Sequence, residues 1–563
     1  MVIASPPHAP SVADIVGSTR IWGVWTSLYG QRSERNAGVG DFEDLARIAE
    51  ELAGSGAAFA GVNPVHSRGI AETGISPYAP SSRTALDAGH IAFDKIPEFA
   101  VSPCARELSD SAGSMMSQAR DATAIDYVQH KKMTIEILRA LFETFEIDAD
   151  STRRSEFEIW RSGRSGASPA PGSSSASRQA CFEALSECFG SDWRSWPEPY
   201  RTFESDAVRD FITGNARAIR FFEWCEWIAE SQLSAAQARA TAAGMPVGLY
   251  LDIAVGVRPG GAETWATPDV FAKGVSLGAP PDLLNAQGQA WNLAGFSPFG
   301  LKENEYRPFR EMLRNTMAHA GMVRIDHIIG LRRSFWLPEN GAPGGYVSFP
   351  SEILMALVRI EAQRANCLVV GEDLGTVPEG LRENMEDSGL YGCSIMAFER
   401  SHDGFLPPGQ YRRQSLASFG THDLPPLAGW WQGEDIETRS SLGHLAGEAI
   451  DRAWSERHRD RVGFCRRLAE AGLLPDGIDP EAPPDRLDEA LRDAMHAILA
   501  GSAADLVALG LDDIFGLIDQ QNVPGTVDEA PNWRRRAPVT IEELADTPEL
   551  KRAASIMNTG RRP

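Results

Sequence analysis

Paired cysteines are missing from this sequence. Its seven cysteines are scattered, no two form a CxxC pair, and no Cys/His cluster has zinc-ligand spacing. This usage gives no sign of a metal site and indicates a reducing compartment. Two of them, Cys367 and Cys393, begin apolar stretches and are expected to be small core residues.

Long apolar runs are also absent. No window approaches about 18 uninterrupted apolar residues, so we expect no membrane-spanning helix. The first residues, MVIASPPHAPSVADIVG, have neither a basic start nor a long apolar run. No signal peptide is therefore expected, and the sequence predicts a cytoplasmic protein.

Basic charge is scarce relative to acidic charge. The 563 residues include 54 Lys and Arg against 77 Asp and Glu, a net charge of −23. A nucleic-acid partner is excluded, because binding a polyanion requires basic patches. The acidity suits a protein that acts on neutral molecules, although it also serves ordinary solubility.

Eight short apolar runs recur along the chain, with helix-like segments between them. Runs that lack polar alternation are typical of strands buried on both faces, as in parallel sheets. We therefore expect an α/β protein of the (β/α)8 TIM-barrel class rather than a doubly wound sheet. Intervening helices are expected at Gly40–Leu52, with Asp41 as N-cap and Gly54 past its end, and at Glu352–Arg364. The strand candidates are Trp22–Tyr29, Phe59–Val65, Val247–Ile253, Met322–Asp326, Leu368–Asp373, Ile395–Glu399, Leu416–Asp423 and Leu506–Asp513.

The spacing of these runs is uneven and predicts large helical insertions. An N-terminal extension (1–21) and the first two strands (22–65) are followed by a mostly helical insertion (66–246) that contains the helical pattern Arg217–Ala229. Within this insertion, Ser162–Ser177 has low complexity and is expected to be a mobile surface loop. The remaining expected parts are strands three to seven (247–433), a smaller helical insertion (434–500), and barrel closure with a C-terminal tail (501–563).

Three acidic residues follow predicted strands, namely Asp326 in MVRIDH, Glu372 in LVVGED and Asp423 in SFGTHD. The carboxyl ends of barrel strands carry the active sites of this fold class. Cleavage of a glycosidic bond requires one carboxylate to attack the anomeric carbon and another to protonate the leaving oxygen. Each acid alone is better explained as the N-cap of the next helix, but the three together, in this order and with these neighbours, favour catalysis.

Neighbouring residues refine these roles. Arg324 lies two positions before Asp326 and therefore shares its side of the strand, where a guanidinium keeps the carboxylate ionised or closes a structural ion pair. Glu372 follows an apolar run and lies among other acids, and both features raise the pKa of a carboxyl group. Asp373, next to it, is expected to point elsewhere and to bind sugar.

Several motifs along nearly the whole chain resemble those of glycoside hydrolase family 77, the amylomaltases or 4-α-glucanotransferases (disproportionating enzymes). The segment GLRRSFWLPENGAPGGYVSFP is similar to the bacterial maltose-utilisation branch of that family. The motifs that carry the resemblance are SLYGQRSERNAGVGDFEDL (27–45), SPYAPSSR (76–83), GLYLDIAVGV (248–257), GAPPDLLNAQGQAW (278–291), RIDHIIGL (324–331), VGEDLGTVP (370–378), THDLPP (421–426) and VPGTVDEAPNWRRR (523–536).

The resemblance implies transfer of α-1,4-glucan segments between maltooligosaccharides by a retaining mechanism, without a cofactor or metal. Asp326 is implied as the nucleophile, Glu372 as the acid/base and Asp423 as the residue that stabilises the transition state. The resemblance places further residues around the sugar. Arg324, His422 and Asp252 are implied at the reacting glucose, Ser76 and Tyr78 as its stacking wall, His327 and Asp373 on the acceptor side, and Trp291 and Asn292 on a covering loop.

Three departures from the family pattern concern acceptor and loop positions. Ile328 and Ile329 stand where many relatives have Phe-Arg, Pro426 stands where Thr is usual, and the sequence after Trp291 differs from the common form. They leave open a mainly hydrolytic relative of the α-amylase type as an alternative. A non-catalytic carbohydrate-binding barrel is a further alternative, but it predicts the loss of at least one of the three acids, and all three are present.

Overall fold

The fold is built around an eight-stranded parallel sheet. The computed structural model describes residues 3–164, 175–281, 288–402, 404–527 and 529–561. Its strands follow the order β11-β8-β5-β2-β1-β16-β15-β12, and every neighbouring pair is parallel. The bounds are β1 (Ile21–Thr26), β2 (Phe59–Val62), β5 (Gly248–Ile253), β8 (Met322–Ile325), β11 (Leu368–Gly371), β12 (Gly392–Ile395), β15 (Ser415–Ser418) and β16 (Leu506–Gly510).

Tyr391 closes this sheet into a barrel. Its backbone N–H donates to the carbonyl of Val369 (2.9 Å), and its carbonyl accepts from the N–H of Gly371 (2.8 Å). These bonds join β11 to the residue that precedes β12, which are the two edges of the sheet. The expected (β/α)8 barrel is therefore confirmed.

Each of the eight predicted strands overlaps an observed one, and one of them was misplaced. The strand expected at Ile395–Glu399 begins earlier, at Gly392, and ends at Ile395. The chain turns there, because the N–H groups of Phe398 and Glu399 both donate to the carbonyl of Ile395. Apolar character alone does not distinguish a strand from the buried turn that follows it.

The two predicted helices are present as α2 (Phe42–Gly54) and α12 (Ser351–Ala365). Asp41 is the N-cap of α2, and its side chain accepts a hydrogen bond from the N–H of Asp44. Gly54 is the last residue of α2 rather than the residue beyond it, because the helix ends in a right-handed cap at Ser55.

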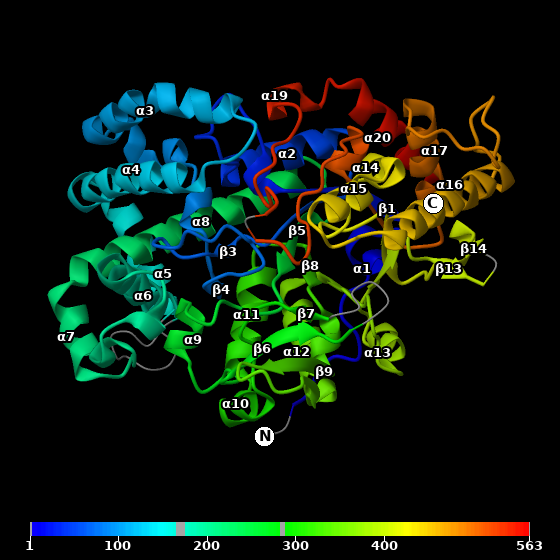
Figure 1. The fold of residues 1–563 in the computed structure, drawn as a ribbon. Coiled ribbons are helices and arrows are strands. Elements are labelled where there is room, and N and C mark those ends of the chain that lie inside the picture. Colours follow the sequence, from blue (N-terminus) through cyan, green and yellow to red (C-terminus); the bar gives the residue numbers. More distant parts are fainter. Residues whose placement is uncertain (1–2, 165–174, 282–287, 403, 528, 562–563) are drawn as a thin grey trace.

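Helices occupy most of the chain between β2 and β5. Figure 1 shows α3 to α7 on one side of the barrel, and α8 with its pattern Arg217–Ala229 packs against α2 and α6. The predicted loop Ser162–Ser177 lies largely outside the described residues, and its two ends belong to α5 and α6. These elements are the hairpin β3 (His66–Ser67) and β4 (Ser82–Leu86), with α3 (Pro103–Asp121), α4 (Tyr127–Asp148), α5 (Ser151–Arg164), α6 (Ser175–Phe189), α7 (Asp206–Gly214) and α8 (Ala216–Ala242).

A second, antiparallel sheet in the order β10-β9-β6-β7 was not predicted. It is formed by β6 (Val275–Ala279), β7 (Gln289–Ala290), β9 (Arg333–Pro338) and β10 (Gly345–Ser348), in segments that follow β5 and β8. On the opposite side of the barrel from α3 to α7, Figure 1 shows α16 and α17. Further helices of the chain are α10 (Pro298–Glu303), α11 (Arg307–Met317), α13 (Leu381–Asp387), α14 (Leu427–Gln432), α15 (Glu434–Ser441), α16 (Glu448–Glu470) and α17 (Glu489–Ala500).

The barrel interior is a packed core with a charged layer above it. Phe59, Tyr250 and Met322 belong to one buried apolar cluster, which also contains Cys393 as expected. Asp252 and Arg324 are register partners on β5 and β8. Because residues two apart on a strand share a face, these two charges lie directly above Tyr250 and Met322, towards the carboxyl ends of the strands.

Candidate active site

Arg324 is the centre of the charged layer. One terminal nitrogen donates to both carboxylate oxygens of Asp252 (2.9 and 2.8 Å), and the other lies 2.8 Å from Oδ1 of Asp326. Burial alone would lower the pKa of Arg324, but the two carboxylates outweigh it and hold that pKa well above its usual range. The expected pairing of Arg324 with Asp326 is therefore present, and Arg324 carries a permanent positive charge.

Glu372 lies beside Asp326 at the ends of neighbouring strands. Gly371 and Ile325 are register partners, so the two carboxylate-bearing residues follow matched positions on β11 and β8. The carboxylate of Glu372 accepts from the N–H of Leu374 (2.8 Å) and of His327 (3.0 Å). Burial raises the pKa of Glu372 to about 7; the charge of Asp326 also raises this pKa, whereas the charge of Arg324 lowers it.

Tyr78 and His422 form a stacked wall beside this layer. Their rings lie 4.1 Å apart at 16°, and the Tyr78 hydroxyl donates to Oδ2 of Asp252 (2.7 Å). The same hydroxyl lies 2.9 Å from Nδ1 of His422, from which it accepts when that nitrogen is protonated. Ser76 supports the turn, because its hydroxyl accepts from the N–H of Tyr78 (3.3 Å).

Asp423 projects into the mouth with its side chain 49% exposed. Desolvation opposes its ionisation, but the imidazole of His422, 3.3 Å away, and the amide of Asn522 outweigh it and lower its pKa to about 2. The same contact with Asp423 raises the pKa of His422, against the desolvation of the ring. Each of the two side chains thus favours the charged form of the other.

His327 and Trp291 meet at the other side of Glu372. Their rings are 5.1 Å apart in an edge-to-face arrangement, and burial lowers the pKa of His327. Asn292, which is exposed, and His327 both have positive φ angles (56° and 49°), a conformation that non-glycine residues hold only where the surroundings impose it. Part of the loop expected to cover the sugar, 282–287, lies outside the described residues.

Comparison with known proteins assigns this arrangement to a family. The family model described as 4-alpha-glucanotransferase, that of glycoside hydrolase family 77, matches residues 26–540. The chain belongs to this family.

Individual relatives agree with the family assignment. The chain is 35% identical to a 4-alpha-glucanotransferase of Mycobacterium tuberculosis over 94% of its own length and 72% of the relative's. It is 31% identical to a 4-alpha-glucanotransferase of Haemophilus influenzae over 97% of its own length and 80% of the relative's. Family 77 membership assigns 4-α-glucanotransferase activity to the chain and rules out the non-catalytic barrel.

Solved structures show the same fold. The amylomaltase of Corynebacterium glutamicum superposes with a TM-score of 0.86 at 31% identity, covering 98% of this chain and 77% of that one. An amylomaltase of Streptococcus agalactiae in complex with acarbose has a TM-score of 0.74 at 17% identity and covers 96% and 99%.

The structure of this chain corrects one of the site predictions. Asp373, expected to bind sugar on the acceptor side, has no exposed surface, and its carboxylate is bound by Arg382 and Arg412. The reason is strand alternation: Glu372 points to the barrel mouth, so the next residue points away from it. The departures Ile328 and Ile329 are likewise buried, so they do not contact an acceptor sugar.

Sequence reasoning missed the residues that hold Asp423 from the C-terminal side. Nδ2 of Asn522 donates to the carboxylate of Asp423 (2.7 Å), and Nε2 of Gln520 donates to its backbone carbonyl (2.8 Å). Trp533 packs 5.4 Å from Tyr78. The sequence signal for the two amides was the run QQN (520–522), directly before the motif VPGTVDEAPNWRRR.

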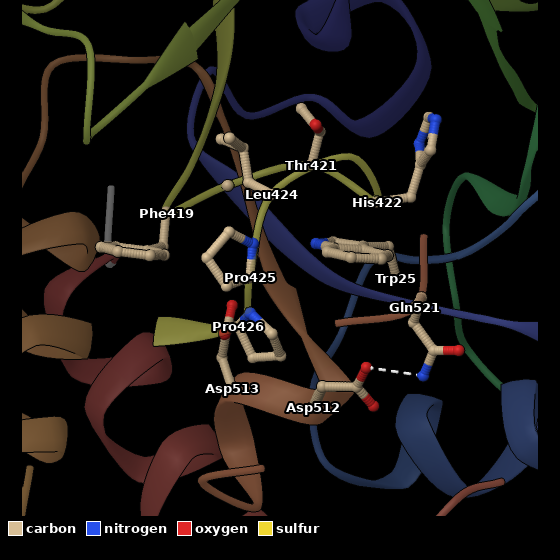
Figure 2. A pocket seen from close by; sticks show the side chains of 11 residues that line it. Trp25, Phe419, Thr421, His422, Leu424, Pro425, Pro426, Asp512, Asp513 and Gln521 are labelled. Carbon is tan, nitrogen blue, oxygen red and sulfur yellow. Dashed lines mark hydrogen bonds between the residues drawn. The ribbon is translucent and has the colours of Figure 1, made fainter. Parts of the chain in front are cut away.

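A pocket lies behind the loop that carries His422. Figure 2 shows Trp25 and Gln521 lining it, with Gln521 hydrogen-bonded to Asp512. Pro426, one of the departures, lines the same pocket just before α14. The residues that line this pocket pack against the loop that carries His422.

Metal and membrane features are absent from the part of the chain that the structure describes. Among the described residues, no group of three or more His, Cys, Asp or Glu is arranged to hold a metal ion. Nor does any described helix have the length and apolar content needed to cross a bilayer.

Proposed function

We propose that this family 77 enzyme transfers α-1,4-glucan segments between maltooligosaccharides through a covalent glycosyl-enzyme formed on Asp326, with Glu372 as acid/base. The observation that carries the proposal is the pair of carboxyl groups at the ends of β8 and β11. β8 and β11 are neighbouring strands in matched register, about 4.8 Å apart, so the two carboxyl groups project from adjacent backbone positions. Adjacent positions suit a retaining pair, whose carboxyl groups lie about 5–5.5 Å apart.

The two carboxyl groups have opposite electrostatic environments. Asp326 is paired with Arg324, whose terminal nitrogen lies 2.8 Å from Oδ1 and orients the carboxyl group that attacks the anomeric carbon. Glu372 is buried with a pKa of about 7, so near neutral pH it carries the proton that the leaving oxygen needs and later accepts one from the incoming hydroxyl. Environments that separate two carboxyl groups in this way define which is nucleophile and which is acid.

Around this pair, other side chains bind the sugar. Asp252, Tyr78 and His422 surround the reacting glucose, and Asp423 offers an ionised carboxylate to hydroxyl groups and to the developing positive charge. His327, Trp291 and Asn292 form the acceptor side, where an aromatic face suits a sugar ring. The acarbose complex of the Streptococcus agalactiae amylomaltase supports an oligosaccharide ligand.

Transfer requires an acceptor sugar to react before water does. The glycosyl-enzyme therefore has to wait in a site where the acceptor hydroxyl is held in line and water is largely excluded. The half-buried Trp291 and His327 are placed to hold that acceptor beside Glu372. A reducing compartment such as the cytoplasm suits the seven free cysteines.

The first test is the product profile from maltotriose. The wild type is expected to release glucose and to build a ladder of longer glucans, because each glycosyl-enzyme is passed to another sugar. Asp326→Asn is expected to abolish both, while Glu361→Gln, which removes a buried carboxylate on α12 far from the site, leaves them intact. Glucose and maltose without longer products would instead establish hydrolysis, and an active Asp326→Asn variant would exclude Asp326 as nucleophile.

A further inference from the structure

Asp373 forms a fully buried charge cluster directly behind Glu372. Its carboxylate accepts four hydrogen bonds, from Nε of Arg382 (2.8 Å), from both terminal nitrogens of Arg412 (2.7 and 3.1 Å) and from the N–H of Cys393 (2.8 Å). Arg382 also donates to the backbone carbonyl of Asp373 (3.2 Å). No oxygen of this side chain is left for solvent or substrate.

The cluster joins four separate segments at one point. Asp373 follows β11, Cys393 lies in β12, Arg382 lies in α13, and Arg412 precedes β15. The segment before β15 reaches Asp373 past Gly392, where an added Cβ would lie 2.3 Å from the Arg412 guanidinium. The absence of a side chain at this position is thus required for the contact.

The same cluster holds one of the two donors that bind Glu372. Leu374, whose N–H donates to Oε1 of Glu372, is the residue immediately after Asp373. Glu372, Asp373 and Leu374 are consecutive, so anchoring the Asp373 side chain fixes the backbone of both neighbours. It therefore holds the Cα of Glu372 and also the Leu374 N–H that binds the Glu372 carboxylate. The second donor, the N–H of His327, comes from the neighbouring strand and does not depend on Asp373.

We propose that Asp373 is a positioning residue for the acid/base, which it holds at the leaving oxygen through Leu374 and the end of β11. The inference rests on the proposed role of Glu372. Stability alone explains the cluster poorly, because a buried carboxylate with two arginines contributes little compared with a well-packed apolar group. A fixed geometry is what proton transfer requires, since a displacement of about 1 Å can cost about 10²-fold in rate.

The test compares two donors of the same maltosyl group whose leaving groups differ in their need for a proton. Maltotriose requires the acid to protonate its leaving sugar, whereas α-maltosyl fluoride loses fluoride ion without protonation. The rate of fluoride release in the first turnover therefore reports attack by Asp326 alone. Asp373→Asn is expected to lower maltotriose turnover about 10²-fold and to leave first-turnover fluoride release close to wild type.

Two reference variants separate the possible failures. Glu372→Gln must show the same split between donors; if it does not, the acid/base assignment itself is wrong. If Glu372→Gln shows the split but Asp373→Asn slows both donors alike, or neither, the positioning role is overturned. Glu361→Gln is the matched control, because its carboxylate is equally buried and bound by Arg310, Arg314 and Arg364, and it should affect neither donor.

A milder variant covers the case in which Asp373→Asn does not fold. Arg382→Gln removes the donors to Asp373 from a side chain that is 52% exposed, so its effect on folding is small. It is expected to reduce maltotriose turnover less than Asp373→Asn, again without slowing fluoride release. Equal loss on both donors in the folded variant contradicts the proposal.

Discussion

Individual charges at the barrel mouth are set by their nearest neighbours. Glu372 and Asp423 are both carboxylic acids that follow barrel strands, but burial raises the pKa of Glu372 to about 7, whereas contact with His422 and Asn522 lowers that of Asp423 to about 2 despite desolvation. One side chain is therefore a proton carrier near neutral pH and the other a permanent anion. The difference arises from contacts that no local sequence feature specifies.

The pKa of Glu372 predicts the alkaline limb of the activity profile. Because the first step needs the protonated acid, kcat/KM for maltotriose should fall about tenfold per pH unit above about pH 7. The sign follows from the raised pKa: the required form is complete below it and lost above it. Initial rates across the pH range check this, and first-turnover fluoride release from α-maltosyl fluoride should lack the limb. A flat maltotriose profile up to pH 9, about two units higher, would falsify the assignment.

Asn522 is predicted to orient Asp423. In Asn522→Leu the donor to Oδ1 is lost, so kcat/KM should fall roughly tenfold, the worth of one hydrogen bond to a charged group. Its thermal midpoint should stay near that of the wild type. Asn304→Leu, which removes an amide-to-carbonyl bond at the end of α10, serves as control. Equal kcat/KM values in the two variants would show that Asn522 does not orient Asp423.

At the scale of elements, helix ends follow local rules while sheet partners do not. The side chain of Asp126 accepts from the N–H of Gln129 and caps α4, a contact made within four consecutive residues. The short strand β7, by contrast, comprises only Gln289–Ala290 and exists because β6 lies beside it. Such strands have no periodicity of their own.

Removing the α4 cap should destabilise the protein without affecting catalysis. Asp126→Ala is expected to reduce the free energy of unfolding by about 1 kcal/mol, because one N-terminal N–H loses its partner. Asp126→Asn restores an acceptor and should recover most of the loss. Urea unfolding midpoints at unchanged slope measure both, and an alanine variant as stable as the asparagine variant would contradict the capping role.

At the scale of the whole molecule, the site is assembled from distant parts of the chain. Tyr78 lies between β3 and β4, after the second barrel strand. Asp326 and Glu372 follow β8 and β11, in the middle of the sequence. Asn522 and Trp533 come from the C-terminal segment. The closing contact of Tyr391 with β11 lies next to Glu372 in sequence and space. The hydrogen bond that closes the barrel at Gly371 therefore also fixes the backbone next to Glu372.

Activity is expected to need no metal ion. The positive charge beside Asp326 comes from Arg324, and the Arg324 guanidinium binds the carboxylates of both Asp252 and Asp326. Exhaustive dialysis against a chelator should therefore leave maltotriose turnover unchanged. A loss of activity that is restored by one divalent cation would show that a carboxylate here serves as a metal ligand instead.

The sequence alone determined the parts of this protein that depend on short-range pattern. Apolar runs overlapped all eight barrel strands, although the one expected at Ile395–Glu399 was misplaced, and three acids that follow such runs, Asp326, Glu372 and Asp423, lie at the mouth of the observed barrel. Strand alternation also correctly predicted that Arg324 shares a face with Asp326. These features follow from periodicity and from neighbours within a few residues.

Only the tertiary structure decided what lies behind and beside those acids. Alternation predicted that Asp373 points away from Glu372, but whether that side holds sugar or arginines depended on Arg412, which precedes a different strand. Asn522, far along the chain from Asp423, became its partner in the same way. Contacts of this kind are absent from local sequence because the energy that forms them comes from segments brought together when the barrel closes.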